Sequence, residues 1–115
     1  MGNEMAEATE PVLAVLESET LESAMAAIED NGYRCVVIVD QQNRVVGTAS
    51  DGDLRRAMLA HHILKTPVGQ VMKRNCVMLT ADELGRAEEL FERERISIIP
   101  VVDEDGKLLR VLTAF

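Results

Sequence analysis

The feature that most constrains this chain is an internal repeat. Residues 13–50 align without a gap on residues 76–113, at an offset of 63 residues. A helix-length segment, two strand-length segments and a polar turn recur in the same order in both copies. The positions that are identical in the two copies are Leu16/Leu79, Leu21/Leu84, Ala24/Ala87, Glu29/Glu92, Val39/Val102 and Asp40/Asp103. We therefore expect two similar units that share a core across a pseudo-twofold axis, and any cleft that they form should occur twice.

The apolar periodicity within each copy predicts an α/β fold built from two β-α-β-β-α units, with sheets packed against helices. For the first copy we expect strands at 12–16, 35–39 and 44–49, a helix at 19–31 capped by Ser18 or Thr20, and a helix from Ser50 through Ile63. For the second copy we expect strands at 76–79, 98–102 and 107–113 and a helix at 82–94.

These elements predict how the chain is divided. We expect a disordered tail at 1–10, a first repeat at 11–62, a linker at 63–75 with a short helical turn after Pro67, and a second repeat at 76–115. By the repeat offset the last helix of the second copy would begin near residue 114, so that copy lacks it. Because an open helix position leaves one side of a sheet uncovered, we expect the chain to be a piece of a longer protein.

Composition restricts the possible partners and compartment. The chain has 115 residues, of which 47% are apolar, which is enough for one core. A net charge of −8 argues against a nucleic-acid partner. No run approaches the roughly 20 apolar residues of a membrane span, and residues 1–10 lack the basic start and apolar stretch of a signal peptide. We expect a cytoplasmic protein in which Cys35 and Cys76 are buried free thiols.

The strand-to-helix junction at Gly47–Asp53 holds the densest group of candidate binding residues. N–H groups at the start of a helix bind phosphate, the Ser50 hydroxyl could add a hydrogen bond, and the Asp53 carboxylate could accept two ribose hydroxyls. The same Ser-x-x-Asp spacing also predicts a capping box that only satisfies the first turn of the helix. Two carboxylates would repel a phosphate unless Arg55 or Arg56 offsets them.

The doubled unit, with a strand that ends in G-x-x-[ST]-x-x-D, resembles the paired CBS (cystathionine β-synthase) domain over residues 12–115. The stretch Ser97–Asp103 is also similar to that family. The resemblance implies a regulatory module that binds adenosine nucleotides, with AMP, ADP or ATP as possible ligands. It implies that Ser50 contacts the ligand phosphate and that Asp53 contacts the ribose. The binding residues that it implies are Gly47, Thr48, Ser50 and Asp53, the base-pocket residues Tyr33, Arg34 and Cys35, the matching wall Ser97, Ile98, Ile99 and Pro100, and Thr113.

The second copy departs from this motif. Arg110 stands where the motif has glycine, Thr113 keeps the hydroxyl, and the aspartate would fall at residue 116. The second site is therefore expected to be weaker than the first or incomplete.

The segment Gly47–Ala57, followed by Val71, Met72 and Asn75, resembles CBS pairs fused to sugar-phosphate nucleotidyltransferases, and next those fused to sugar-phosphate isomerases. The resemblance implies an attached catalytic domain that the module regulates. No nucleophile with an adjacent base and no metal-ligand set can be identified, so we expect no enzyme activity in this chain.

Two alternatives remain at this point. The repeat could be only a dimerisation module, because its helices carry more apolar surface than short strands can cover, at Ala24, Ala27, Ile28, Leu54 and Met58. Asp51 and Asp53 could instead form the metal-binding D-x-D of a glycosyltransferase, but that motif requires a much larger nucleotide-sugar domain.

Two other groups of residues are not expected to bind a metal ion. The adjacent His61 and His62 point to different faces of a helix, and the acidic turn at Asp103–Gly106 has too few ligands for calcium.

Overall fold

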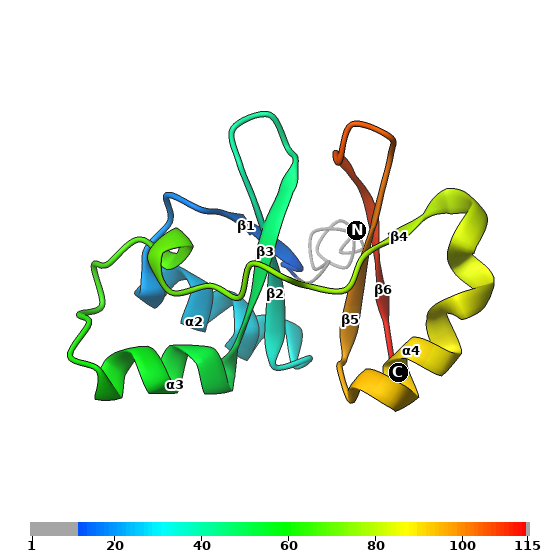
Figure 1. Ribbon diagram of the computed structural model, residues 1–115. Coiled ribbons are helices and arrows are strands. Elements are labelled where there is room, and N and C mark those ends of the chain that lie inside the picture. The colour runs from blue at the N-terminus through cyan, green and yellow to red at the C-terminus, as the bar shows by residue number, and fades with distance from the viewer. Residues whose placement is uncertain (1–11, 115) are drawn as a thin grey trace, which may run out of the picture.

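The computed structural model describes residues 12–114 and contains two three-stranded sheets that lie side by side, with helices on their outer sides (Figure 1). The first repeat consists of β1 (Ala14–Leu16), α2 (Leu21–Asn31), β2 (Cys35–Val39), β3 (Val45–Ser50) and α3 (Asp51–Leu59). The linker holds a short 3-10 helix, η1 (Val68–Gln70), and the second repeat consists of β4 (Leu79–Thr80), η2 (Ala81–Arg86), α4 (Ala87–Glu94), β5 (Ile98–Val102) and β6 (Leu108–Thr113). The predicted α/β architecture is confirmed. The tail predicted at 1–10 lies outside the described residues.

The two sheets have the same topology and almost the same register. In each sheet the first strand is parallel to the middle strand, and the middle strand is antiparallel to the last. Cys35 pairs with Ser50 in the first hairpin and Ile98 pairs with Thr113 in the second. Both hairpins shift register at the same place in the repeat, next to Val39 and next to Val102. Because these pairs differ by the same 63 residues as the sequence alignment, the hairpins of the two copies are structurally equivalent.

The core is divided into three layers. Leu21, Ile28 and Leu54 belong to the cluster between the first sheet and its two helices. Leu79, Leu90 and Ile99 form the corresponding cluster on the outer side of the second sheet. A third cluster, built on Val37, Val39 and Ile98, fills the space between the sheets. Successive side chains along each middle strand therefore alternate between two different apolar clusters, one on the outer side of the sheet and one between the sheets.

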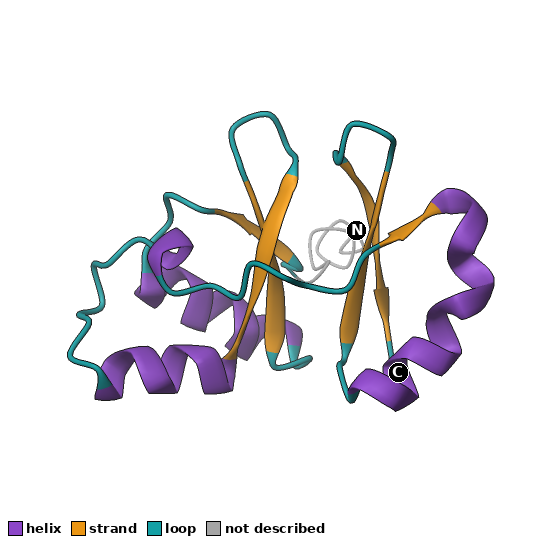
Figure 2. Ribbon diagram, in the orientation of Figure 1, coloured by secondary structure: helices purple, strands orange, loops and turns teal. Residues whose placement is uncertain are grey.

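The two hairpins contact each other at their tips, which lie at the upper edge of Figure 2. The Val45 N–H donates to the Gly106 carbonyl (2.9 Å), and the Leu108 N–H donates to the Asn43 carbonyl (2.9 Å). At the other end of the sheets, the Ser97 hydroxyl donates to the Tyr33 carbonyl. Hydrogen bonds thus join the two repeats at both ends of the layer between the sheets.

Local chemistry explains the helix ends of the first repeat. Thr20 caps α2, because its Oγ1 accepts the Ser23 N–H at 3.1 Å, and Gly32 ends the helix with a left-handed φ of 74°. The prediction that the second helix continues through Ile63 was wrong, since α3 ends at Leu59. His61 adopts φ 74°, and its N–H turns back to the Met58 carbonyl, which closes the helix.

The second repeat differs from the expected single helix at 82–94. Residues 81–86 form the 3-10 helix η2 before α4 begins at Ala87. Gly85 lies in this segment and has a low intrinsic helix propensity. Leu84 is 37% exposed, whereas Leu21, at the same position of the first repeat, is fully buried. The start of this helix therefore lacks the packing that stabilises its counterpart.

A proline shortens the first strand of the second sheet, which was predicted at 76–79 and contains only Leu79 and Thr80. In the first repeat the Val37 N–H donates to the Leu13 carbonyl at 2.8 Å and extends the pairing of β1. Pro100 occupies the position of Val37 and has no N–H to donate. The ladder between β4 and β5 begins with the pair Leu79–Val101, and its register is shifted by one residue relative to the ladder between β1 and β2, which begins with Ala14–Val37.

No helix among residues 12–114 is long and apolar enough to cross a membrane.

Candidate functional site

The junction between β3 and α3 forms a complete capping box. The Ser50 Oγ accepts the Asp53 N–H at 3.0 Å, and the Asp53 Oδ2 accepts the Ser50 N–H at 2.9 Å. The other carboxylate oxygen of Asp53 pairs with the Arg56 guanidinium at 2.7 Å. The capping geometry predicted from the Ser-x-x-Asp spacing is therefore present, and each carboxylate oxygen of Asp53 has a partner within the chain.

Cys35 lies next to this junction, at the start of β2 and opposite Ser50 in the register. Burial raises the pKa of the Cys35 thiol to about 12, and the nearby Asp53 carboxylate contributes to the same shift. The thiol is therefore neutral at physiological pH. The preceding residue, Arg34, is exposed and has a φ of 65°, and its carbonyl accepts the Asp51 N–H at 3.0 Å. The start of β2 and the start of α3 are thus joined directly.

The two faces of β3 separate the candidate residues that precede Ser50. Ala49 packs into the outer cluster with Leu54, so the alternation of the strand turns Thr48 and Ser50 toward the second sheet. Gly47 faces outward, against the linker. A Cβ at Gly47 would lie 2.5 Å from the Lys73 carbonyl oxygen.

The linker crosses β3 at this point as a short antiparallel bridge. The Thr48 N–H donates to the Lys73 carbonyl (3.0 Å), and the Lys73 N–H donates to the Thr48 carbonyl (2.8 Å). The glycine is therefore required by the close approach of the linker backbone. The sequence gives no signal for this contact, because the two segments are far apart along the chain.

Tyr33 connects the first junction to the second repeat. Its side chain packs against the cluster between the sheets, which contains Ile98. Its N–H donates to the Asn31 Oδ1 at 2.7 Å, and its carbonyl accepts the Ser97 hydroxyl. The Asn31 amide also donates to the carbonyls of Val12 (2.8 Å) and Cys35 (3.1 Å). Asn31, which sequence reasoning did not single out as a site residue, thus fixes the loop that carries Tyr33 and Cys35.

The wall predicted at 97–100 is divided between the two faces of β5. Ile98 points into the layer between the sheets, together with Cys35 and Tyr33. Ile99 is fully buried on the opposite side, in the cluster with Leu79 and Leu90. Pro100 is also buried, and it lies on the face of Ile98 by alternation. The structure therefore brings Ile98, but not Ile99, to the side of β5 that faces the first junction.

The second junction repeats the backbone of the first. The Ala114 N–H donates to the Ser97 carbonyl at 2.9 Å, as the Asp51 N–H donates to that of Arg34. Thr113 occupies the position of Ser50, opposite Ile98. Arg110, at the position of Gly47, is exposed. Among the described residues, the second junction therefore keeps the hydroxyl of the motif but not its glycine.

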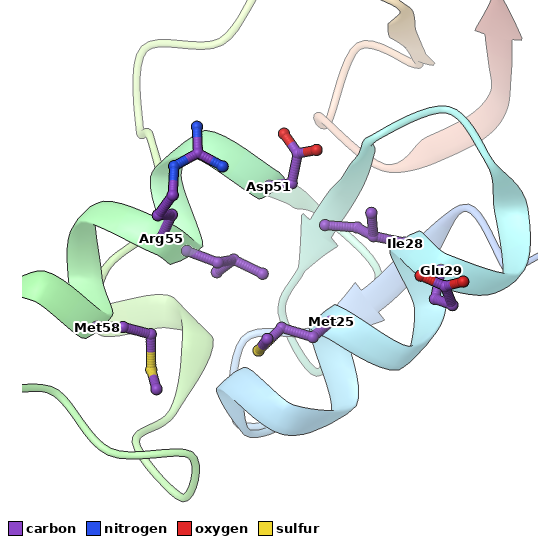
Figure 3. A pocket seen from close by; sticks show the side chains of 7 residues that line it. Met25, Ile28, Glu29, Asp51, Arg55 and Met58 are labelled. Carbon is purple, nitrogen blue, oxygen red and sulfur yellow. The ribbon is translucent and has the colours of Figure 1, made fainter.

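A separate cavity of about 370 Å³ lies between α2 and α3, on the outer side of the first repeat (Figure 3). Met25 and Met58 line it from opposite helices, and Arg55 and Asp51 project at its upper end in Figure 3. This groove shares Asp51 with the junction but none of the residues turned toward the second sheet. Its apolar residues recur at the helical spacing of α2 and α3, and this spacing is the sequence pattern that indicated an apolar surface here.

Metal binding has no structural support in residues 12–114, where no group of three or more His, Cys, Asp or Glu side chains could hold an ion. In particular, Asp53 is engaged with Ser50 and Arg56.

The duplicated three-stranded units and the Gly47–Asp53 junction together define a class of tandem-repeat modules. The model of the CBS domain matches residues 4–60 and 68–115, and the chain belongs to this family. Arabinose 5-phosphate isomerase GutQ from Salmonella typhi is 37% identical over 95 residues, which are 82% of this chain and 30% of that protein. The chain thus spans about a third of the length of such relatives.

Solved structures agree with the fold. The CBS domains of a transcriptional regulator from Streptococcus pneumoniae superpose with a TM-score of 0.74 at 19% identity, covering 89% of this chain and 82% of that one. A CBS domain protein from Pyrobaculum aerophilum, solved in complex with AMP, gives a TM-score of 0.73 at 22% identity, covering 90% and 81%.

Proposed function

We propose that this chain is a regulatory module whose first repeat binds an adenosine nucleotide, with AMP, ADP and ATP as the candidate ligands. The observation that carries the proposal is the meeting of Cys35, Ser50 and Asp53 at the start of α3, beside the layer between the two sheets. The AMP complex of the Pyrobaculum protein supports the ligand class.

The chemistry of the junction suits a phosphorylated nucleoside. The N-terminal end of α3 carries a partial positive charge, and the Ser50 hydroxyl can donate to a phosphate oxygen. The exposed Arg34 lies beside that helix end, because its carbonyl accepts the Asp51 N–H. Tyr33, Cys35 and Ile98 offer an apolar surface to the base. Thr48 and Thr113 are further candidate contacts, and Gly47 contributes by allowing the linker to cross.

Ribose binding by Asp53 would require a change of partner. The Arg56 guanidinium occupies one carboxylate oxygen, but the Arg56 side chain is 69% exposed, and exposed ion pairs contribute only about 0 to 1 kcal/mol. A ribose hydroxyl can therefore replace Arg56 at low cost while Ser50 keeps the other oxygen.

The test is calorimetric titration of AMP, ADP and ATP into the chain and into Asp53→Ala. Loss of a charge-assisted contact worth about 1.5 to 3 kcal/mol should weaken binding by roughly ten- to a hundredfold. The matched control is Glu83→Ala, which removes the carboxylate that accepts the Thr80 N–H (2.9 Å) in the capping box of the second repeat. Equal affinities of the Asp53 variant and the parent chain would contradict the ribose role.

We further infer that the module regulates an attached sugar-phosphate enzyme rather than catalysing a reaction itself. The similarity to GutQ favours a sugar-phosphate isomerase as the parent protein. The sequence analysis gave the isomerase as its second candidate, after a nucleotidyltransferase. The nucleotidyltransferase remains a prediction without support from these relatives. Because coupling is reciprocal, saturating arabinose 5-phosphate should change the nucleotide affinity of a full-length isomerase, and identical affinities would leave a tether as the remaining account.

Dimerisation is a second candidate function, favoured by the groove between α2 and α3. Of the residues proposed from the sequence for this surface, Ile28, Leu54 and Met58 line the groove, but Ala24, Ala27, Ile28 and Leu54 are buried inside the first repeat. Met58 (38% exposed), Met25 (41%) and Leu59 (74%) are the side chains that remain available. Sedimentation equilibrium should show a dimer that Met58→Glu weakens and that Met78→Glu, at a site 43% exposed in the parent, does not.

A further inference from the structure

The linker places one lysine at the edge of the proposed nucleotide site. The Thr48 N–H donates to the Lys73 carbonyl at 3.0 Å, and the Lys73 N–H donates to the Thr48 carbonyl at 2.8 Å. Side chains that lie directly opposite each other in an antiparallel pair are on the same face. Because Thr48 is turned toward the second sheet, as Ser50 is, the Lys73 side chain is turned the same way.

The residue before Lys73 supports this orientation. Met72 is buried and belongs to the outer cluster of the first repeat, together with Ala49. Consecutive side chains of an extended segment point to opposite sides, so Lys73 faces away from that cluster. The linker then runs from β3 to β4 of the second sheet, across the front of the layer between the sheets (Figure 1). Lys73 lies where this crossing begins.

Electrostatic effects on two thiols agree with this placement. Burial raises the pKa of the Cys76 thiol, and the positive charge of Lys73 partly offsets that shift. Burial also raises the pKa of the Cys35 thiol to about 12, with smaller contributions that include Asp53 and Cys76. Cys35 packs against the cluster between the sheets. The four groups are therefore neighbours beside the start of α3.

The basic side chains of α3 are engaged elsewhere. Arg56 is paired with Asp53 at 2.7 Å, and Arg55 lines the cavity between α2 and α3, on the outer side of the first repeat. Lys73 is exposed and forms no ion pair with any residue in the described range 12–114. Its ammonium is therefore available to offset the repulsion between the Asp53 carboxylate and a phosphate.

We propose that Lys73 binds the phosphate group of the nucleotide, so that the first repeat selects phosphorylated ligands over the free nucleoside. This role rests on the proposed function, because it adds a residue to the same site. Ser50 lies two residues beyond Thr48 on the same face of β3, a distance of about 7 Å along the strand. A lysine side chain is long and flexible enough to bring its charge to a phosphate bound by Ser50.

The experiment is calorimetric titration of adenosine, AMP and ATP into the chain of 115 residues and into three variants, Lys73→Gln, Lys73→Arg and Arg74→Gln. Arg74→Gln is the matched control. It removes the same charge one residue further along the linker, where the Arg74 guanidinium donates to the Gly69 carbonyl at 3.3 Å. The Lys73 variants keep the backbone bonds to Thr48, so their urea midpoints should stay close to that of the parent chain.

We expect Lys73→Gln to weaken the binding of AMP about tenfold and that of ATP more strongly, because a charge-assisted hydrogen bond is lost. Its affinity for adenosine should not change. Lys73→Arg and Arg74→Gln should bind all three ligands as the parent chain does.

The outcomes separate this role from the proposed function. Unchanged affinity of Lys73→Gln for AMP and ATP would overturn the role of Lys73 and leave the proposed function standing. An equal loss for adenosine would also overturn it, because Lys73 would then act on the fold rather than on the phosphate, and so would an equal loss in Arg74→Gln. A parent chain that binds none of the three ligands would overturn the proposed function, and the role of Lys73 with it.

Discussion

Replacing Gly47 by alanine should destabilise the first repeat by forcing the linker away from β3. The new Cβ would lie 2.5 Å from the Lys73 carbonyl oxygen and 2.9 Å from the Met72 sulfur, whereas ordinary contacts begin at 3.4 Å. The sulfur is on a flexible side chain and can move, but the carbonyl belongs to the backbone. The linker must therefore shift by roughly 0.9 Å at Lys73, which is the difference between the ordinary contact distance of 3.4 Å and the 2.5 Å from the new Cβ to the Lys73 carbonyl oxygen.

The cost follows from the contacts that such a shift disturbs. Overpacking of a closed site costs about 1 to 3 kcal/mol. The two hydrogen bonds between Thr48 and Lys73, at 3.0 and 2.8 Å, contribute about 0.5 to 1.5 kcal/mol each. If half of that energy is lost, the free energy of unfolding falls by about 2 to 4 kcal/mol. With a urea slope of about 2 kcal/mol/M, the midpoint should fall by about 1 to 2 M.

Urea unfolding followed by circular dichroism measures this effect, and Gly85→Ala is the matched control. A Cβ at Gly85 meets nothing within 4 Å, and its φ is not in the left-handed range. Since alanine is favoured over glycine in a helical segment by up to about 1 kcal/mol, the control should be neutral or slightly more stable. A Gly47→Ala chain as stable as the parent would refute the claim that the linker requires this glycine.

Three further changes test other parts of the fold. The unfolded Cys35 thiol ionises near pH 8.5, while the folded thiol keeps its proton to about pH 12, so the stability present at neutral pH should decline above about pH 8.5. In Cys35→Ala the urea midpoint should therefore fall less between pH 7 and pH 10 than in the parent chain, and an equally steep decline would contradict this. Arg95 ends α4 with φ 55° at the position of Gly32, so Arg95→Gly should raise the thermal midpoint by an amount equivalent to about 0.5 to 1 kcal/mol, and a lower midpoint would argue against strain there. Asn31→Ala should cost about 1 to 3 kcal/mol, because it leaves the Tyr33 N–H without its 2.7 Å partner; chemical denaturation within 0.5 kcal/mol of the parent would mean that water replaces the amide.

The strands at the centre of each sheet were predictable because their physical signal is local. The β-branched run Cys35–Val39 and the stretch Ile98–Val102 are too short for helices and too apolar for loops, and both strands have the predicted bounds. Helix ends were less predictable, since they depend on distant packing. Ile63 fits the apolar period of α3, yet the chain turns at His61, and the Ile63 N–H donates instead to the Thr66 hydroxyl at 3.1 Å.

The candidate site divides in the same way. The capping box of Ser50 and Asp53 follows from three-residue spacing and was predicted. The approach of the Cys35 thiol to Asp53 depends on strand register and was not predicted, because the family resemblance implied only that both residues belong to one binding site. The sequence could not show which of Ile98 and Ile99 faces the first repeat, because both faces of this strand are buried and its residues are therefore all apolar. The contact between Gly47 and Lys73 joins segments that share no sequence pattern.

The hydrogen bonds that join the two sheets at both ends restrict how a ligand can reach the layer between them. The hairpin tips are tied through Val45 and Leu108, and the opposite end is tied through Tyr33 and Ser97. A clamshell motion about either end would break the bonds at the other. Exchange of the proposed nucleotide should therefore proceed by rearrangement of side chains, with the spacing of the sheets unchanged. Its binding beside Ser50 would act first on β3 and on the linker, because Thr48 is hydrogen-bonded to Lys73.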